Sequence, residues 1–271
     1  TPDVENAQLN RWISFGAAPD GSDKSYSLDY IRQEYPTGCQ TDYRMPAVQA
    51  VFEDGSRAVE LVYESYRILP GKPGLQGLPA TYVENEEEAD TLEITLSDTL
   101  KHMKVTLMYT VYKELDVITR SVKIRNESAE RIRLEKAVSA SVDFETSDYE
   151  LVDLPGAWGR ERHIEKTKLR SGIQELQSRR GASSHQMNPF FALAEPGAGE
   201  DRGKVYGFAL VYSGNFTAGA EVDQIFQTRA WIGLNGYDFS WLLESGETFQ
   251  TPEAVMVYSS EGFGKMSRTF H

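Results

Sequence analysis

The feature that most limits the possible folds is a two-residue alternation of apolar and polar side chains. It is clearest in three segments, Thr91–Leu96, Lys104–Val111 and Asp116–Ile124. Because successive side chains of a β-strand point to opposite faces, this alternation is typical of half-buried antiparallel strands. The last segment is predicted to turn Ile118 and Val122 toward a core.

The rest of the chain supplies further strand candidates, separated by short turn signals such as Asn235-Gly236. No long stretch has the apolar spacing of a helix, and only Gly264–His271 is expected to begin one. The pattern predicts an all-β fold, a large two-sheet antiparallel β-sandwich. No linker composition divides the chain, so we expect residues 1–271 to form a single domain. The further strand candidates are Val48–Glu53, Val59–Leu69, Ile132–Phe144, Glu150–Asp153, Phe190–Ala194, Val205–Tyr212, Gly219–Ile225, Arg229–Leu234 and Thr248–Tyr258.

The overall charge narrows the choice of partners. The 271 residues include 41 acidic and 28 lysine or arginine residues, giving a formal net charge of −13. Binding to nucleic acid or to an anionic membrane surface needs a basic face, so we expect neither partner. No apolar run approaches the length of a membrane span. The single cysteine, Cys39, excludes an internal disulfide and fits a reducing compartment, which favours a cytoplasmic protein.

Residue patterns that would bind a metal or a cofactor are missing from the sequence. The four histidines, at positions 102, 163, 185 and 271, have no paired spacing with each other or with Cys39. No glycine-rich loop ends in the Gly-Lys-Ser/Thr that a phosphate site needs. We therefore expect neither a metal nor a cofactor.

Two arginine-rich blocks, Leu154–Arg162 and Ser178–Phe190, interrupt the strand pattern. Both are longer than a strand connection requires, so each is expected to do more than turn the chain. One interpretation is a sugar platform built from aromatic and polar groups. The interpretation that we favour is a contact between domains, because arginine and aromatic residues are enriched at interfaces. The candidate contact residues are Trp158, Arg160, Arg162, Arg179, Arg180 and His185.

These blocks, together with Tyr206–Phe216 and Phe249–Ser259, resemble in order the N-terminal domain of the α-galactosidases of glycoside hydrolase family 36. The resemblance runs from about Ser25 to His271. It implies a supersandwich like that of galactose mutarotase, within a retaining enzyme that acts on melibiose and raffinose. It also implies that both catalytic aspartates lie on a (β/α)8 barrel expected after His271, and that further strands precede Thr1. The chain alone is then expected to be inactive.

The same resemblance implies roles for particular residues. In such enzymes the N-terminal domain supports the barrel, forms contacts of a homo-tetramer and edges the substrate pocket. Trp12, within Asn10–Ile13, matches a loop that reaches a neighbouring subunit's active site, where its ring would stack on a sugar. Asp42 and Arg44, within Thr41–Ala47, are the other candidate substrate contacts. The alternative for these two is that they pair with each other and hold the loop.

Two other classes of protein compete with this interpretation. A stand-alone carbohydrate-binding module would gather exposed aromatic residues on one sheet face, whereas the aromatic residues here are spread through the strand segments. An aldose epimerase would share the large sandwich but needs paired histidines and a glutamate. The spacing of the histidines in this chain does not group them in that way.

Overall fold

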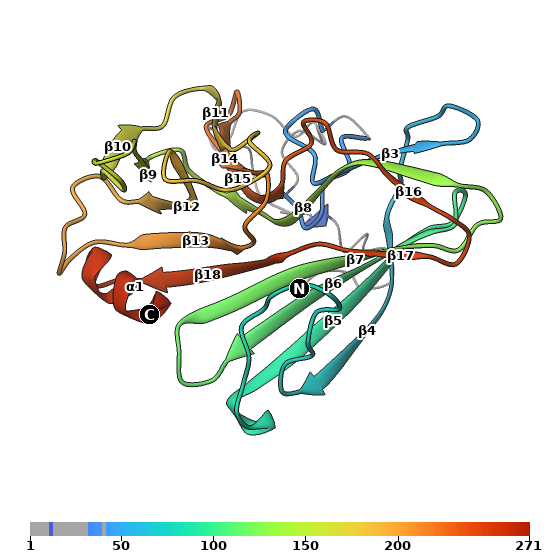
Figure 1. Ribbon diagram of the computed structural model, residues 1–271, viewed down its shortest axis with the longest axis horizontal. Helices are drawn as coiled ribbons and strands as arrows, with labels where there is room; N and C mark the ends of the chain where they lie inside the picture. The colour runs from blue at the N-terminus through green and yellow to red at the C-terminus, as the bar shows by residue number, and fades with distance from the viewer. Residues whose placement is uncertain (1–10, 13–31, 40–41) are drawn as a thin grey trace, which may run out of the picture.

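The computed structural model describes residues 11–12, 32–39 and 42–271, and within them the chain forms two large antiparallel sheets (Figure 1). The larger sheet has ten strands, in the order β10-β9-β12-β13-β18-β7-β6-β5-β4, with β17 also paired to β7. These strands are β4 (Val62–Pro70), β5 (Ala89–Asp98), β6 (Met103–Tyr112), β7 (Val117–Asn126), β9 (Glu150–Pro155), β10 (Glu165–Lys168), β12 (Met187–Ala194), β13 (Val205–Val211), β17 (Thr248–Gln250) and β18 (Glu253–Ser259).

The smaller sheet has six strands, in the order β11-β14-β15-β8-β16, with β3 also paired to β8. The strands are β3 (Val48–Phe52), β8 (Ile132–Phe144), β11 (Gly172–Gln177), β14 (Phe216–Val222), β15 (Thr228–Leu234) and β16 (Trp241–Leu243). Two short strands, β1 (Arg11–Trp12) and β2 (Arg32–Gln33), pair with each other. A 3-10 turn at Glu86–Glu88 and the helix α1 (Gly262–Phe270) complete the described elements. The predicted two-sheet sandwich is confirmed, as is a helix near the C-terminal end.

The predicted strand Thr248–Tyr258 was wrong, because the structure divides it into β17 and β18 at Thr251-Pro252. Proline has no N–H to donate to a ladder, so regular pairing is interrupted here. The side-chain hydroxyl of Thr251 accepts from the N–H of Val122 at 2.9 Å. Strands β10, β11 and β16 were missed. They are short, and β10 is exposed throughout, so its sequence carries no apolar alternation.

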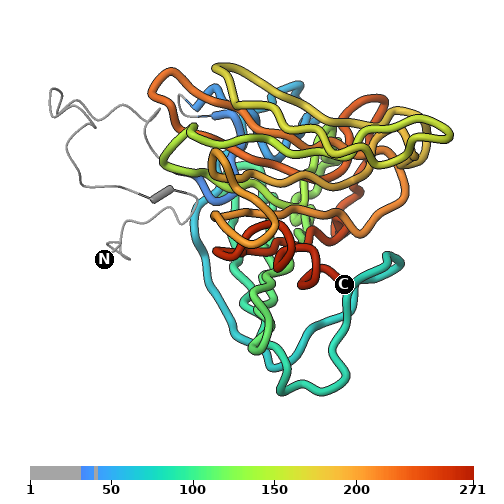
Figure 2. The backbone as a smooth tube through the Cα atoms, turned by 90° about the vertical axis from the view of Figure 1, so that its left-hand side faces the viewer, coloured from blue at the N-terminus to red at the C-terminus, as the bar shows by residue number. Residues whose placement is uncertain are grey.

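The main core lies between the two sheets. Val122 and Ile124 are fully buried there against Leu134 of the smaller sheet, as the alternation predicted for Val122. Ile118 lies on the same strand but is 41% exposed, which corrects its predicted burial. Figures 1 and 2 show β4–β7 diverging from the smaller sheet. Ile118 lines a cavity there instead of packing in the core.

A second, smaller core lies on the other face of the large sheet, under α1. The side chain of Met266 from the helix packs with Ala192, Val255 and Val257. Gly207 of β13 faces the helix, where a Cβ atom would lie 2.6 Å from the ring of Phe270. The helix therefore seats tightly on β13 and β18 at the end of the chain (Figure 1).

Candidate functional site

The two arginine-rich blocks form an exposed surface. All six candidate contact residues are exposed, and Trp158 is exposed to 90%. A tryptophan this exposed is unusual on a soluble surface and is typical of a contact site. We call this set the arginine surface: Trp158, Arg160, Arg162, Arg179, Arg180 and His185.

The two blocks meet at Gly156, although residues 163–177 separate them in sequence. The N–H of Gly156 donates to the carbonyl of Gln186 at 3.2 Å. A Cβ atom at this position would lie 2.7 Å from the carbonyl oxygen of His185 and 2.9 Å from that of Arg160. Glycine is therefore needed for the two backbones to approach, and the first block is held in place by the second.

The second block is itself fastened to the loop after β13 and to the loop after β15. The N–H groups of Gly181 and Ser183 donate to the side-chain oxygen of Asn215 at 2.7 Å and to the carbonyl of Ser213 at 2.8 Å. The guanidinium of Arg179 lies over the ring of Tyr237, 4.6 Å from its centroid. The arginine surface is thus built on four loops with fixed mutual contacts.

Asp42 and Arg44 lie in a buried group of charges. Arg44 donates to both carboxylate oxygens of Asp42, at 3.0 and 3.2 Å. Arg229 donates to Asp42 at 2.8 Å and to Asp143 at 2.7 and 2.9 Å. Asp223 adds a third carboxylate, 3.5 Å from Arg44. We call these five residues the aspartate–arginine network, and none has a side chain more than 7% exposed.

Within the network, the pKa values of Asp42 and Arg229 are shifted toward the ionised state, whereas burial raises the pKa of Asp223. Burial alone would raise the pKa of Asp42, but the guanidinium groups of Arg229 and Arg44 lower it below its ordinary value. Burial by itself would lower the pKa of Arg229, but its contacts with Asp143 and Asp42 raise this pKa above its ordinary value. The pairing of Asp42 with Arg44 that we considered as an alternative is present. Their contact with substrate stays a prediction, and both line a cavity of about 360 Å³.

Sequence patterns did not indicate Arg229, Asp143 and Asp223 as partners in this network. They lie 101 or more positions from Asp42, and each sits in or beside a strand whose apolar pattern hides it. Trp12 lies in β1, where it pairs with Arg32 through the backbone. Its predicted neighbours Asn10 and Ile13 lie outside the described residues, so its contact with substrate also stays a prediction.

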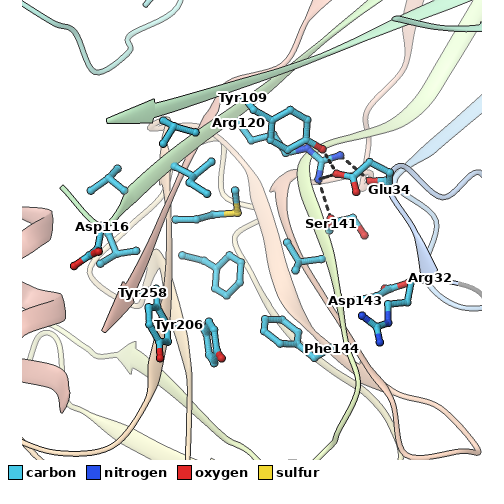
Figure 3. Close-up of a pocket in the computed structure, with 18 of the residues that line it drawn as sticks. Arg32, Glu34, Tyr109, Asp116, Arg120, Ser141, Asp143, Phe144, Tyr206 and Tyr258 are labelled. Carbon is cyan, nitrogen blue, oxygen red and sulfur yellow. Dashed lines mark hydrogen bonds and ion pairs between the residues drawn. The ribbon is translucent and has the colours of Figure 1, made fainter. Parts of the chain in front are cut away.

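A cavity of about 740 Å³ lies between the sheets where they diverge (Figure 3). Apolar side chains such as Ile118 and Met256 form much of its wall. At one end Arg120, 1% exposed, donates to the carbonyls of Ser141 at 2.8 Å and Glu34 at 2.7 Å. Among the described residues, its Nε atom has no hydrogen-bond partner.

The carboxylates that line this cavity are all paired with cations. Glu34 lies 3.4 Å from Arg120, Asp143 lies 2.7 Å from Arg229, and Asp116 lies 3.0 Å from Lys265 outside the cavity.

In the part of the chain that the structure describes, no three His, Cys, Asp or Glu side chains are placed to hold a metal ion. The same residues contain no helix that is long and apolar enough to cross a membrane.

Comparison with known proteins then identifies the family. Residues 5–244 match the model of the glycosyl hydrolase family 36 N-terminal domain. The chain belongs to this family. Over 258 residues it is 55% identical to the α-galactosidase AgaA of Geobacillus stearothermophilus, covering 95% of this chain and 35% of that protein. It is 45% identical over 256 residues to α-galactosidase 1 of Pediococcus pentosaceus, with 94% and 35% covered.

Solved structures of the family agree with the fold. A crystal structure of an AgaA variant in complex with raffinose superposes with a TM-score of 0.90 at 54% identity, covering 99% of this chain and 37% of that chain. A complex of another variant with stachyose gives the same TM-score, with 98% and 37% covered. The chain therefore corresponds to the N-terminal part of family 36 α-galactosidases and spans little more than a third of their length.

Proposed function

We propose that this chain is the non-catalytic N-terminal domain of a retaining α-galactosidase that releases terminal α-galactosyl residues from raffinose-type oligosaccharides. The observation that carries the proposal is the 55% identity to AgaA over 95% of the chain. The fold match to AgaA variants bound to raffinose and stachyose supports this class of substrate.

We infer that the arginine surface is the part of this domain that contacts the catalytic barrel. Its six side chains are exposed, while the loops beneath them are fixed to one another by hydrogen bonds. The guanidinium groups of such a surface can donate paired hydrogen bonds to carboxylates and carbonyls of a second domain. The loops beneath them keep their conformation when the second domain binds. Assembly into a homo-tetramer and contact of Trp12 with the outer sugars of the substrate are further parts of the proposal. So is a cytoplasmic location, in keeping with the single Cys39.

The test uses the longer protein in which this chain is followed by a barrel. It should release galactose from raffinose and melibiose, with the anomeric configuration of the product retained. Nuclear magnetic resonance spectra of the released galactose, recorded during the reaction, would report both the reaction and its stereochemistry. A longer protein that leaves both sugars intact, or that inverts the anomeric centre, would contradict the proposal.

A further inference from the structure

A second cavity, of about 680 Å³, borders the second arginine-rich block at Gly181 and shares no lining residue with the aspartate–arginine network. The loop that contains Gly74 and Leu78 and the loop from Asn235 to Phe239 both line it. Strands β16 and β17 contribute Trp241 and Gln250 to the lining. We call this cavity the tyrosine groove, after Tyr237 on its wall.

Two aromatic rings are presented at this groove. Tyr237 is 54% exposed and Trp241 is 49% exposed. Arg179 covers one face of the Tyr237 ring, and Arg179 lines the neighbouring cavity of about 440 Å³ but not the groove. The other face of Tyr237 is therefore the one that the groove can use. Trp241 rests on Phe249, with ring centroids 5.3 Å apart.

Both walls of the groove are held from behind. The side-chain amide of Asn235 donates to the carbonyls of Ser178 at 3.1 Å and Phe216 at 3.2 Å, which fixes the loop that carries Tyr237. The opposite loop is anchored at Lys72 and Thr81, which both contact the carboxylate of Glu253. A site with fixed walls loses little conformational entropy when a ligand binds.

The polar groups of the groove select the class of ligand. Lys123 and Gln250 are cross-strand partners on its floor, and Asn215 and Asp238 lie on its sides. The charged side chains of the lining are Lys123 and Asp238, so the lining has no net charge. This disfavours a phosphate or a carboxylate ligand. Exposed aromatic faces beside amide and charged hydrogen-bonding groups match a sugar, with its apolar C–H faces and its hydroxyls.

We propose that the tyrosine groove binds a neutral oligosaccharide, with one sugar ring stacked on Tyr237 and a second against Trp241. The site is a binding site and takes no part in bond cleavage. It goes beyond the proposed function, because it concerns saccharide binding by the N-terminal domain itself. Its volume falls in the range of small-molecule sites, about 300–1,000 Å³, and suits a ligand of a few sugar rings.

The experiment is a calorimetric titration of the 271-residue chain with raffinose, since this chain contains no barrel that could bind the sugar in its place. We expect saturable binding. Tyr237→Ala should weaken it at least about fivefold, as expected for the loss of one stacked ring. Tyr237→Phe should keep it within about twofold, because the ring face is retained. Trp241→Ala should weaken it as well.

Trp158→Ala is the matched control, since it removes an equally large exposed ring from a different surface and should leave the affinity unchanged. Circular dichroism of every variant checks that the fold is intact. Absence of saturable heat up to the solubility limit of raffinose would overturn the proposal. So would an affinity that Tyr237→Ala leaves unchanged, or that Trp158→Ala reduces as much. Hydrolysis by the longer protein is measured separately, so failure of this proposal leaves the proposed function standing.

Discussion

The ammonium group of Lys72 lies 2.5 Å from a carboxylate oxygen of Glu253, and each of these side chains is 2% exposed. The second carboxylate oxygen accepts from the N–H and the hydroxyl of Thr81, at 2.9 and 2.7 Å. Glu253 is the first residue of β18, so these contacts fasten the segment between Lys72 and Thr81 to the large sheet. The sequence pattern did not indicate this buried anchor, because its charged partners lie far apart in the chain.

Replacement of Lys72 should destabilise the chain strongly. Lys72→Met leaves the carboxylate of Glu253 buried without its cation, which typically costs about 3–5 kcal/mol. The measurement is the free energy of unfolding from urea titration. Lys113→Met is the control, because its pair with Asp90 is exposed on both sides and should contribute only about 0–1 kcal/mol. Equal effects of the two substitutions would show that the anchor is not a major source of stability.

Arg229 should be the most sensitive member of the aspartate–arginine network, since it bonds to two carboxylates and its side chain is 0% exposed. Arg229→Met should lower the free energy of unfolding by about 3–5 kcal/mol, because Asp42 and Asp143 would each lose a buried partner. Arg57→Met provides the comparison, as Arg57 pairs with Glu135 at the surface. A loss below about 1 kcal/mol for Arg229→Met would contradict the network's structural role.

Asp153 should make the stability depend on pH. Burial, and secondarily the charge of Glu165, raises the pKa of Asp153 from 3.8 to about 6. The folded chain therefore holds this proton more tightly than the unfolded chain does. The stability that this group contributes is full below pH 3.8 and is lost as the pH rises to about 6.

Asp153→Asn should accordingly raise the Tm near pH 7, on the order of 2–4 °C, and change it little near pH 4. Differential scanning calorimetry at the two pH values makes the comparison. Asp148→Asn, with a side chain 68% exposed, should be neutral at both. A variant that is less stable than the native chain near pH 7 would mean that the Asp153 carboxylate is stabilised by its surroundings.

A charge reversal in the arginine surface should change the Tm of the longer protein more than that of the 271-residue chain. Arg162→Glu should lower the Tm of the longer protein, because the reversed charge would face groups that suit an arginine. In the 271-residue chain the same change should have little effect, since Arg162 is exposed there. A large loss of Tm in the 271-residue chain would instead mean that Arg162 stabilises the sandwich itself.

The strands were predictable because alternation is a local property of the sequence. It placed Val122 correctly, since the smaller sheet covers that part of β7. It failed at Ile118, because the extent of the covering sheet is set by the divergence of strands far apart in the chain. It also failed at β10, where four exposed polar residues pair with β9 through the backbone alone.

The candidate site was predictable to the extent that its residues are close in sequence. Asp42 and Arg44 are two positions apart, so their pairing could be considered from the sequence. Their contacts with Arg229 and Asp223 arise only when the loop before β3 packs on β14 and β15. Nor could periodicity show that Tyr237 and Trp241 face one cavity, because a loop separates them and its path depends on Asn235.

The central claim, that this chain is a domain of an α-galactosidase and does not itself catalyse, is tested most directly by hydrolysis of 4-nitrophenyl α-galactoside. Purified 271-residue chain and the longer protein are assayed at equal molar concentration, beside a mock preparation. The account predicts release of 4-nitrophenol by the longer protein and none above the mock by the 271-residue chain. Release by the 271-residue chain alone, or no release by the longer protein, would contradict it.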